Sequence, residues 1–543
     1  MSPGTARIRP ARLFALAVAL AVAAVGCRPS ATSTSRAPQG ALQGSDFPDA
    51  AERPNIVFIL ADDLGYSDIS PYGSEIETPH LRRLAEGGMR FTQMHNTSKC
   101  FPSRAELLTG VYAQQSHMHD GPGHFENSVL LGEVLKQAGY RTLFVGKHHS
   151  TDNPTNWGFD HYRGLRDGAA NYFNPGKKRP FDPGKPAQKD WAYPRTFVFD
   201  DSVAAPFTPE KGYYSTDTWT TWALDLLRQH EEERKPFFLY LSYQAPHDPL
   251  QAPPETIEKY EGAYDEGYAA VRQARYDRLT ESGLIDEETY PLSEPTHRDW
   301  SSLSDSAKAD QTRRMEVYAA MIDRMDQNIG RVIDYLEQRG ALENTLILFA
   351  SDNGASSEVV KIGDGPIGSM TRWASLGEDW ANVGNTPFRY YKNYSYQGGV
   401  ATPFIAYWPG VVAPGTTSEY VSRFLDVMPT LVDLAGATYP DRYKGAPVVE
   451  MQGRSLLPIL KGETPARRSG PLFWKWQDGR AIYRDGWKLV EEGDRGWELY
   501  DLFEDRSETQ NRAPERPSLV EDLGSTWRQW YEGTARYRTP DTP

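Results

Sequence analysis

Runs of apolar residues, many of them β-branched or aromatic, recur along the chain and predict strands that are buried on both faces. The first run is Asn-Ile-Val-Phe-Ile-Leu at 55–60, and similar runs occupy 141–145, 236–243, 345–350 and 402–408. Helical apolar patterns lie between them, at 78–88, 128–138, 216–233 and 311–339. Buried strands that alternate with helices indicate an α/β fold with a large, mostly parallel or mixed sheet sandwiched by helices.

The pattern changes in two other regions. Residues 164–211 are rich in Pro, Gly, Asp and aromatic residues and lack periodicity, so we expect loops over the sheet edge there. After about Ala435 the chain shows alternating runs at 480–490 and 497–502, which predict antiparallel strands. We therefore expect a large domain at 54–435 and a smaller C-terminal subdomain with an antiparallel β-sheet at 436–543.

The N-terminal residues predict targeting and not a packed structure. Three arginines precede an apolar run at 13–25, which is shorter than the roughly 20 residues of a membrane span and is typical of a secretory signal. The small residue before Cys27 resembles the bacterial lipoprotein cleavage box. This predicts a lipoprotein-type signal peptide at 1–26, a lipidated Cys27 and a flexible tether at 27–53. We expect export to the bacterial cell envelope, in the periplasm or at the outer surface; a plain cleaved signal is the alternative.

Composition narrows the possible functions. Among 543 residues, 39% are hydrophobic and 12% aromatic, as suits a globular protein. The chain has 73 acidic and 59 basic residues and a net charge of −14, which argues against a nucleic-acid-binding protein but not against one basic pocket for an anion. Cys27 and Cys100 are the two cysteines of the sequence, so a disulfide framework is excluded.

Polar side chains follow two of the predicted strands. Asp62 and Asp63 follow the first strand, and Asp352 and Asn353 follow the strand at 345–350. Taken singly, each pair is also a common turn or helix-cap sequence. Because active sites gather beyond the carboxyl ends of parallel strands, we expect the two pairs to converge on one cation. Oxygen ligands favour calcium or magnesium over zinc or copper, and a carboxylate-rich site favours calcium.

The segment Cys100-Phe101-Pro102-Ser103-Arg104, followed by Thr109-Gly110, resembles the signature of the sulfatase family. By itself, Cys-x-Pro-x-Arg also fits a buried cysteine at a helix start. The resemblance implies the alkaline phosphatase-like fold and a formylglycine-generating enzyme that oxidises Cys100 to Cα-formylglycine. It also implies that Cys100 joins the metal ligands named above.

Further segments match the family in order. Gly146-Lys147-His148-His149 resembles its Gly-Lys-x-His motif, which implies active-site roles for Lys147 and His149, although the family usually has Trp at the position of His148. His247 lies in a segment similar to the family's Ala-Pro-His, which supplies a histidine on the sulfate side. Lys392 matches a second active-site lysine, and Gln397 replaces the usual Glu. Which of the two adjacent imidazoles faces the site stays open.

The resemblance is closest to bacterial alkyl/arylsulfatases and implies hydrolysis of sulfate monoesters. One hydroxyl of hydrated formylglycine would attack sulfur, and the other would lose a proton to a base, His149, as sulfate leaves. Lys147, Lys392 and Arg104 would supply positive charge, and His247 with Lys392 would bind sulfate and protonate the leaving oxygen. The substrate is expected to be a small sulfate ester or a sulfated glycan. Two alternatives are a phosphonate or phosphate ester hydrolase on the same fold and a non-catalytic lipoprotein that captures sulfated glycans.

Overall fold

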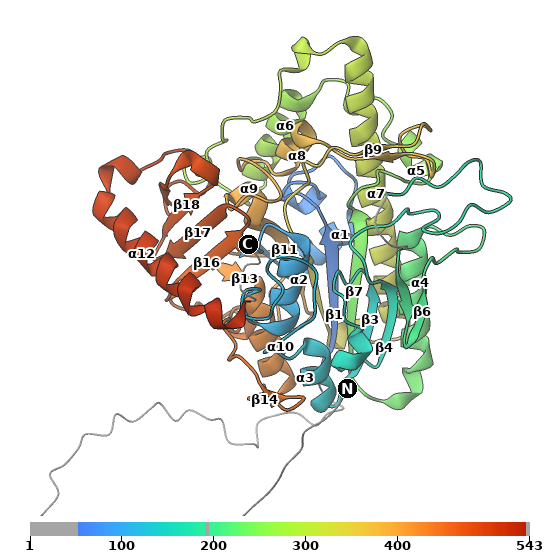
Figure 1. Ribbon diagram of the computed structural model, residues 1–543, viewed down its shortest axis with the longest axis horizontal. Coiled ribbons are helices and arrows are strands. Elements are labelled where there is room, and N and C mark those ends of the chain that lie inside the picture. The colour runs from blue at the N-terminus through green and yellow to red at the C-terminus, as the bar shows by residue number, and fades with distance from the viewer. Residues whose placement is uncertain (1–52, 190–194, 539–543) are drawn as a thin grey trace, which may run out of the picture. The chain divides into compact units, whose positions relative to one another are not determined.

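Strand β1 (Asn55–Asp62) lies in the interior of an 11-stranded sheet in the computed structural model, which describes residues 53–189 and 195–538 (Figure 1). Its neighbours, β7 (Phe237–Pro246) and β8 (Thr345–Ser351), both run parallel to it. Ile56 pairs with Phe238 and Leu346, so the three strands begin together and end at the same edge of the sheet. This edge receives the polar residues that follow β1 and β8.

The outer strands make the sheet mixed. They are β2 (Met89–His95), β3 (Arg141–Gly146), β4 (His161–Leu165), β5 (Phe197–Phe199), β6 (Ser202–Ala204), β11 (Ala401–Tyr407), β12 (Thr416–Ser418) and β13 (Ser422–Arg423). The order is β12-β2-β11-β8-β1-β7-β3-β4-β5-β6, and β13 pairs with β2. Strands β3 and β4 continue the parallel centre, whereas β11 is antiparallel to both β8 and β2. The predicted fold class is therefore confirmed.

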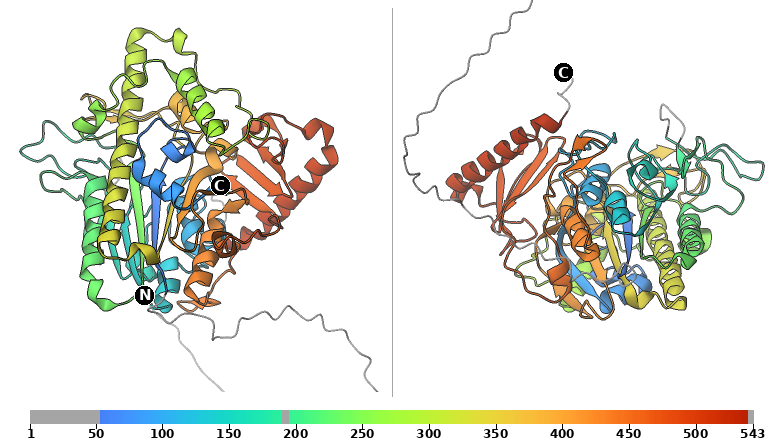
Figure 2. Two further views of the ribbon diagram at one scale, coloured as in Figure 1. Left: turned by 180° about the vertical axis from the view of Figure 1, so that it is seen from behind. Right: turned by 90° about the horizontal axis from the view of Figure 1, so that it is seen from below.

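Helices cover both faces of this sheet because alternate side chains of β1 enter two separate cores (Figure 2). Val57 and Ile59 belong to one core, and Ile56 and Phe58 belong to the other. The first core contains side chains of α1 (Pro79–Glu86), α4 (Ser215–Gln229), α5 (Pro254–Glu258), α6 (Tyr268–Glu281), α7 (Asp305–Gln338) and α8 (Glu378–Gly384). The second contains side chains of α2 (Cys100–Thr109), α3 (Leu131–Gln137), α10 (Val427–Ala435) and α11 (Leu457–Leu460).

The four predicted helices all form, with shifted ends. Helix α7 starts six residues before the predicted position 311 because the side chain of Ser304 caps it and accepts a hydrogen bond from the backbone N–H of Ala307. Helix α4 ends at Gln229 and continues as a 3-10 turn to Glu233, after which Arg234 adopts a left-handed conformation. Other helices, such as α5, α6, α8 and the short α9 (Gln397–Val400), lie outside the four predicted ranges.

The C-terminal region forms a second, four-stranded antiparallel sheet of β16 (Leu472–Trp476), β17 (Gly479–Arg484), β18 (Trp487–Glu491) and β19 (Glu498–Asp501). Helix α12 (Pro517–Gly533) packs against β17 and β18 (Figure 1). The interpretation of 480–490 as one run was wrong, because it is a hairpin. Asp485 and Gly486 form its turn with φ of 53° and 90°, which is the strong Asp-Gly hairpin signal.

The described part of the region at 164–211 contains strands that its composition did not indicate. Strands β5 and β6 add an antiparallel edge to β4, and Phe199 pairs with Arg163. Two further strand pairs are small: β9 (Lys361–Ile362) with β10 (Trp373–Ala374), and β14 (Arg442–Tyr443) with β15 (Ala446–Pro447).

The expected signal peptide, Cys27 and nearly all of the tether lie outside the described residues. Within 53–189 and 195–538, no helix combines the length and apolarity that crossing a bilayer requires.

Candidate active site

The polar residues after β1 and β8 meet at the carboxyl edge of the sheet, as expected. Asp62, Asp63, Asp352 and Asn353 are all at most 2% exposed. The backbone N–H of Asp63 donates to Oδ1 of Asp352 over 3.2 Å, and Nδ2 of Asn353 donates to Oδ1 of Asp63 over 2.7 Å. Asp63 has a φ of 64°, a conformation that turns the chain sharply at the strand end. The parallel register thus brings residues 290 positions apart into contact.

Cys100 is the first residue of helix α2, and the whole signature segment builds that helix. Gly110 ends it in the left-handed region, with a φ of 71°, which explains the Thr-Gly that closes the motif. The sulfur of Cys100 lies 3.7 Å from Oδ1 of Asp63. Burial raises the pKa of the Cys100 thiol to about 12, although Lys392 and Lys147 act in the opposite direction. At neutral pH the thiol is therefore protonated, unlike the thiolate of a cysteine nucleophile.

Arg104 lies one helical turn after Cys100 and is 2% exposed. Its Nε donates to Oδ2 of Asp352 over 2.8 Å, and its Nη1 donates to the carbonyl of Lys147 over 2.9 Å and to Ser242. Burial alone would lower the pKa of Arg104, but Asp352 and Asp62 raise it, so the guanidinium is firmly charged. Arg104 thereby joins α2, β7 and the ends of β3 and β8.

Lys147 follows β3 and is completely buried, and its Nζ lies 2.5 Å from Oδ2 of Asp62. The preceding glycine is required by close packing. Gly146 has a φ of 113°, and a Cβ at that position would lie 1.9 Å from the carbonyl oxygen of Ser242. Only glycine therefore allows the strand end to deliver the lysine to Asp62.

The two adjacent histidines have different surroundings. The ring of His148 lies among Phe125, Phe144 and Tyr162, at centroid distances of 5.4–6.1 Å, and neither ring nitrogen has a hydrogen-bond partner. Such an apolar environment suits the tryptophan that the family usually has there. His149 contacts Phe101, the residue that follows Cys100, edge to face. Burial, then the charges of Lys147 and Arg104, lower the pKa of His149 well below 6.5 and keep it neutral.

Two cationic groups share the carboxylate of Asp63. Nζ of Lys392 lies 2.8 Å from its Oδ2, and Nε2 of His247 lies 3.5 Å from the same atom. On its other side, Nδ1 of His247 lies 3.0 Å from Oδ1 of Asp248. Burial would lower the pKa of His247, but the charges of Asp63 and Asp62 together outweigh it and raise this pKa. Gln397 has a different partner: its Oε1 lies 3.1 Å from Nε2 of buried His95.

The oxygen donors that gather at this edge of the sheet fit a hard cation. Asp62, Asp63, Cys100 and His247 offer ligand atoms that all lie within 4.8 Å of one another, and Asp352 and Asn353 adjoin them. Oδ1 of Asn353 is buried and accepts no hydrogen bond, which is costly unless a cation satisfies it; Oδ1 of Asp62 accepts none either, and Nη2 of Arg104 lies 3.6 Å from it. Burial and then the nearby Asp62 raise the pKa of Asp352 to about 6 despite Arg104, as expected for acidic groups crowded together around a cation site.

Three charged residues that contact one another near Cys100 and Lys392 were not predicted from the sequence. Glu358 lies six positions after Asp352, Lys99 immediately precedes Cys100, and Lys189 comes from the expected loop region. Glu358 approaches both lysines and Lys392. The adjacency of Lys99 to Cys100 was the one available signal.

A network behind Asp63 was also not predicted. The hydroxyl of Tyr318 on α7 donates to Oδ2 of Asp68 over 2.8 Å and lies 3.0 Å from the carbonyl of Asp63. Arg275 of α6 forms an ion pair with Asp68 at 2.5 Å, with both side chains fully buried. These contacts hold the turn after β1 in place.

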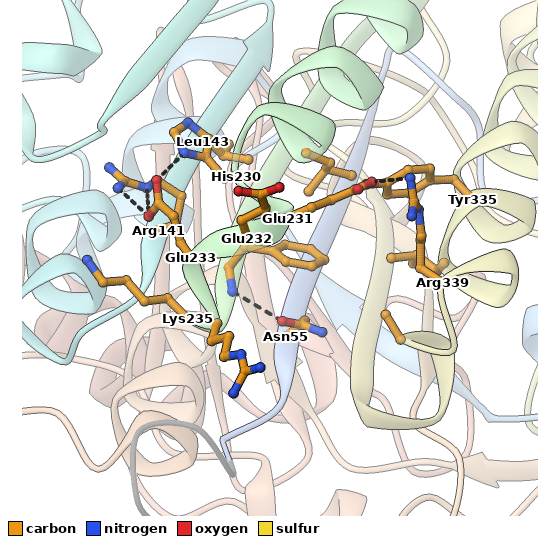
Figure 3. A pocket seen from close by; sticks show the side chains of 15 residues that line it. Asn55, Arg141, Leu143, His230, Glu231, Glu232, Glu233, Lys235, Tyr335 and Arg339 are labelled. Atoms are coloured by element: carbon orange, nitrogen blue, oxygen red, sulfur yellow. Dashed lines mark hydrogen bonds and ion pairs between the residues drawn. The ribbon is translucent and has the colours of Figure 1, made fainter.

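A separate pocket lies at the other edge of the sheet (Figure 3). Asn55, Arg141 and Phe237, the first residues of β1, β3 and β7, contribute to its lining. Several of its charged groups pair with one another: Glu233, for example, contacts both Arg141 and His230 (Figure 3). It lies at the amino ends of the strands, away from Cys100, so it is not the site that the motifs define.

The central sheet and the buried cluster at its carboxyl edge define an enzyme with the alkaline phosphatase-like fold. The model of the family described as "Sulfatase" matches residues 54–437, and a model described as "N-sulphoglucosamine sulphohydrolase, C-terminal" matches 387–526. The chain therefore belongs to the sulfatase family and is a sulfuric ester hydrolase.

Relatives agree with this assignment over most of their length. An uncharacterized sulfatase of Schizosaccharomyces pombe is 31% identical over 90% of this chain and 96% of its own. An arylsulfatase of Klebsiella aerogenes is 33% identical over 79% of this chain and 96% of its own. The solved structure of BT4656 in complex with its substrate D-glucosamine-2-N,6-O-disulfate is similar in fold, with a TM-score of 0.61 and 21% identity, over 89% of this chain and 98% of that one.

Proposed function

We propose that this protein hydrolyses sulfate monoesters with a formylglycine derived from Cys100 and one divalent cation, releasing inorganic sulfate and an alcohol or phenol. The observation that carries this proposal is the placement of Cys100. Its sulfur lies 3.7 Å from a carboxylate oxygen of Asp63, while Lys392 and His247 both contact that same carboxylate. The residue that the family converts is thus beside acidic groups for a metal and basic groups for an anion.

The cation would be held by Asp62, Asp63, Asp352 and Asn353 together with the modified residue 100. Calcium is preferred to magnesium, because a cage of buried carboxylates leaves little room for the waters that magnesium retains. When bound, the cation supplies positive charge that polarises the sulfate group. The buried Oδ1 of Asn353, which accepts no hydrogen bond, supports its presence.

Formylglycine would supply, as its hydrate, a hydroxyl group that attacks sulfur. The buried, protonated thiol of unmodified Cys100 is poorly suited to attack an anion itself, because its pKa is raised to about 12. Conversion requires a formylglycine-generating enzyme as a maturation partner. The chain's own residues then orient the substrate and move protons.

Lys147, Lys392 and Arg104 would offset the negative charge that builds up at the sulfate group. His247 and Lys392 lie on the Asp63 side of Cys100, and we assign them to sulfate binding and to protonation of the leaving oxygen. His149 contacts Phe101 and is kept neutral by burial and by nearby cations, so it can accept the proton that is released as sulfate departs. His149 would thus act as the base, and His247 or Lys392 as the acid, from separate segments of the chain.

The substrate class is a small aryl or alkyl sulfate, or a sulfated glycan. The K. aerogenes relative supports an arylsulfatase-like activity, and the disulfated sugar bound to the BT4656 structure supports the glycan. To test the proposal, the protein is coexpressed with a formylglycine-generating enzyme. Its turnover is then measured on 4-nitrophenyl sulfate, 4-nitrophenyl phosphate and sulfated sugars. Fully converted protein that cleaves the phosphate but none of the sulfates would refute the proposal.

We also propose the domain organisation and location that the N-terminal sequence indicates. Residues 1–26 would be a lipoprotein-type signal and 27–53 a tether, followed by the catalytic domain at 54–435 and the C-terminal subdomain at 436–543. The exported protein would be attached to the bacterial envelope through a lipid on Cys27. The single support for the anchor is the sequence around Cys27.

A further inference from the structure

Glu358 lies in the loop between β8 and β9 and is surrounded by lysines. Its Oε1 lies 3.3 Å from Nζ of Lys392 and 3.9 Å from Nζ of Lys99, and its Oε2 lies 3.5 Å from Nζ of Lys189. Two of these lysines lie over aromatic rings: Lys99 over Trp476 at 5.6 Å and Lys189 over Trp373 at 5.2 Å. One carboxylate therefore sits among three ammonium groups.

This carboxylate differs from the others in the cluster by its exposure. The side chain of Glu358 is 31% exposed, whereas those of Asp62, Asp63, Asp248 and Asp352 are at most 6% exposed. Lys392 bridges Glu358 to Asp63, whose other oxygen lies 3.7 Å from the sulfur of Cys100. Glu358 is thus a negative charge at the open side of the site, one ammonium group away from the proposed metal ligand beside the nucleophile.

We propose that Glu358 is a specificity-determining residue that makes the site prefer a singly charged sulfate monoester to a doubly charged phosphate monoester. The inference rests on the proposed function, because it takes Cys100 as the position of the reacting ester. It goes beyond that function by naming the group that separates the two classes of ester.

The reason is electrostatic. A sulfate monoester carries one negative charge, whereas a phosphate monoester carries about −1.5 to −2 at pH 7, since its second pKa is near 6. Repulsion by the carboxylate of Glu358 is proportional to the charge of the bound ester, so it disfavours the phosphate more. Glu358 also accepts hydrogen bonds from Lys189 and Lys392, so these donors are less available to a second negative charge of the ester.

The test compares Glu358→Gln with Glu358→Asp. Glutamine keeps the size of the side chain and removes its charge, while aspartate keeps the charge. The control is Glu232→Gln, an exposed residue of the pocket at the opposite edge of the sheet, which changes the net charge equally. At pH 8, kcat/KM is measured for 4-nitrophenyl sulfate and 4-nitrophenyl phosphate. In parallel, a Cys100→Ala background is used to measure the Kd of each ester by calorimetry.

Glu358→Gln is expected to shift both the kcat/KM ratio and the Kd ratio toward phosphate by about 10-fold, which corresponds to about 1.4 kcal/mol. Glu358→Asp and Glu232→Gln are expected to leave both ratios within about threefold of the parent, a change of under about 1 kcal/mol. Unchanged ratios in Glu358→Gln would overturn the inference. So would an equal fall in kcat for both esters, because that marks a residue that merely positions Lys392. If the proposed function is wrong, the converted parent protein will not turn over sulfate esters. The Kd ratios measured in the Cys100→Ala background still decide the role of Glu358 in that case.

Discussion

Oδ1 of Asp63 lies 3.7 Å from the sulfur of Cys100, 37 positions later in the sequence. The contact joins the end of a central parallel strand to the first residue of a helix on the second core. Lys392 and His247 reach Oδ2 of the same carboxylate. Asp63 is therefore shared by the proposed nucleophile, the proposed metal and the proposed sulfate-binding groups, so substitutions among these residues are expected to be strongly non-additive.

Replacing Cys100 by Ala is expected to lower aryl sulfatase turnover by at least about 1,000-fold, the scale of losing a covalent nucleophile. The fold should persist, because a small buried side chain replaces another. Turnover of 4-nitrophenyl sulfate measures the loss, and the mass of the peptide that contains residue 100 shows whether the wild-type thiol became an aldehyde. Cys27→Ser, which changes the other cysteine, serves as the control and should keep full turnover. Wild-type turnover by Cys100→Ala would exclude the formylglycine mechanism.

Calcium is expected to raise the Tm of the wild-type protein, because a cation relieves the repulsion between Asp62 and Asp352 and satisfies the free oxygen of Asn353. At about 100 times its Kd, a ligand stabilises the folded state by about 2.7 kcal/mol. Asn353→Ala should lose most of this gain, whereas Asn156→Ala, at an exposed position, should keep it. Thermal melting with added Ca²⁺, Mg²⁺, Zn²⁺ or a chelator makes the measurement. A larger gain with Zn²⁺ would contradict the oxygen-ligand assignment.

Glu106→Gln is expected to reduce the free energy of unfolding by about 3–5 kcal/mol, because it leaves a buried cation without its partner. Glu106, on the helix that begins at Cys100, pairs bidentately with Arg423 at 2.7 and 2.9 Å, and both side chains are 1% exposed. The guanidinium of Arg423 also donates to the carbonyl of Phe473 in β16. Urea denaturation gives the value. The exposed residue Glu515, which pairs with Arg512, supplies the matched control, and Glu515→Gln should cost under about 1 kcal/mol.

His148→Phe is expected to stabilise the protein in mild acid. Burial lowers the pKa of His148 from 6.5 to about 3. The unfolded chain therefore binds a proton below pH 6.5 that the folded chain does not, and stability falls as the pH falls from 6.5 toward 3. Removing this histidine should recover about 2 kcal/mol at pH 5 relative to pH 8.

The measurement for His148→Phe is the free energy of unfolding at the two pH values, compared with wild type and with His124→Gln. The side chain of His124 is 71% exposed, so its replacement should leave the pH dependence nearly unchanged. An equally steep loss of stability in acid for His148→Phe and wild type would show that His148 does not contribute to it.

Cys27→Ser is expected to move the protein from the detergent phase to the aqueous phase and to abolish incorporation of labelled fatty acid. The physical reason is that the acyl chains, and not the protein body, would provide the membrane affinity. Detergent partitioning of both proteins makes the test. If wild type also stays in the aqueous phase without label, the lipid anchor is wrong, while the catalytic proposal is unaffected.

The central strands and the motifs at their carboxyl ends were predictable from sequence because their signals are local. A strand buried on both faces needs a continuous apolar run, and Ile56 to Leu60 shows it without knowledge of any neighbour. The signature from Cys100 to Gly110 is likewise contiguous, since it encodes one helix from its first residue to its left-handed cap. Asp62 and Asp352 could be paired in advance, because parallel strands place their carboxyl ends at one edge.

Tertiary structure alone decided what surrounds each side chain. The motif offered two adjacent histidines, and only the fold showed that His148 packs among aromatic rings whereas His149 contacts Phe101, the residue after Cys100. Glu358 carried no local signal, because its environment comes from Lys99, Lys189 and Lys392 on three other segments. Periodicity reports which face of an element is buried, whereas charge and contact at a site depend on residues hundreds of positions apart. Folding, and not the adjacent sequence, sets those distances.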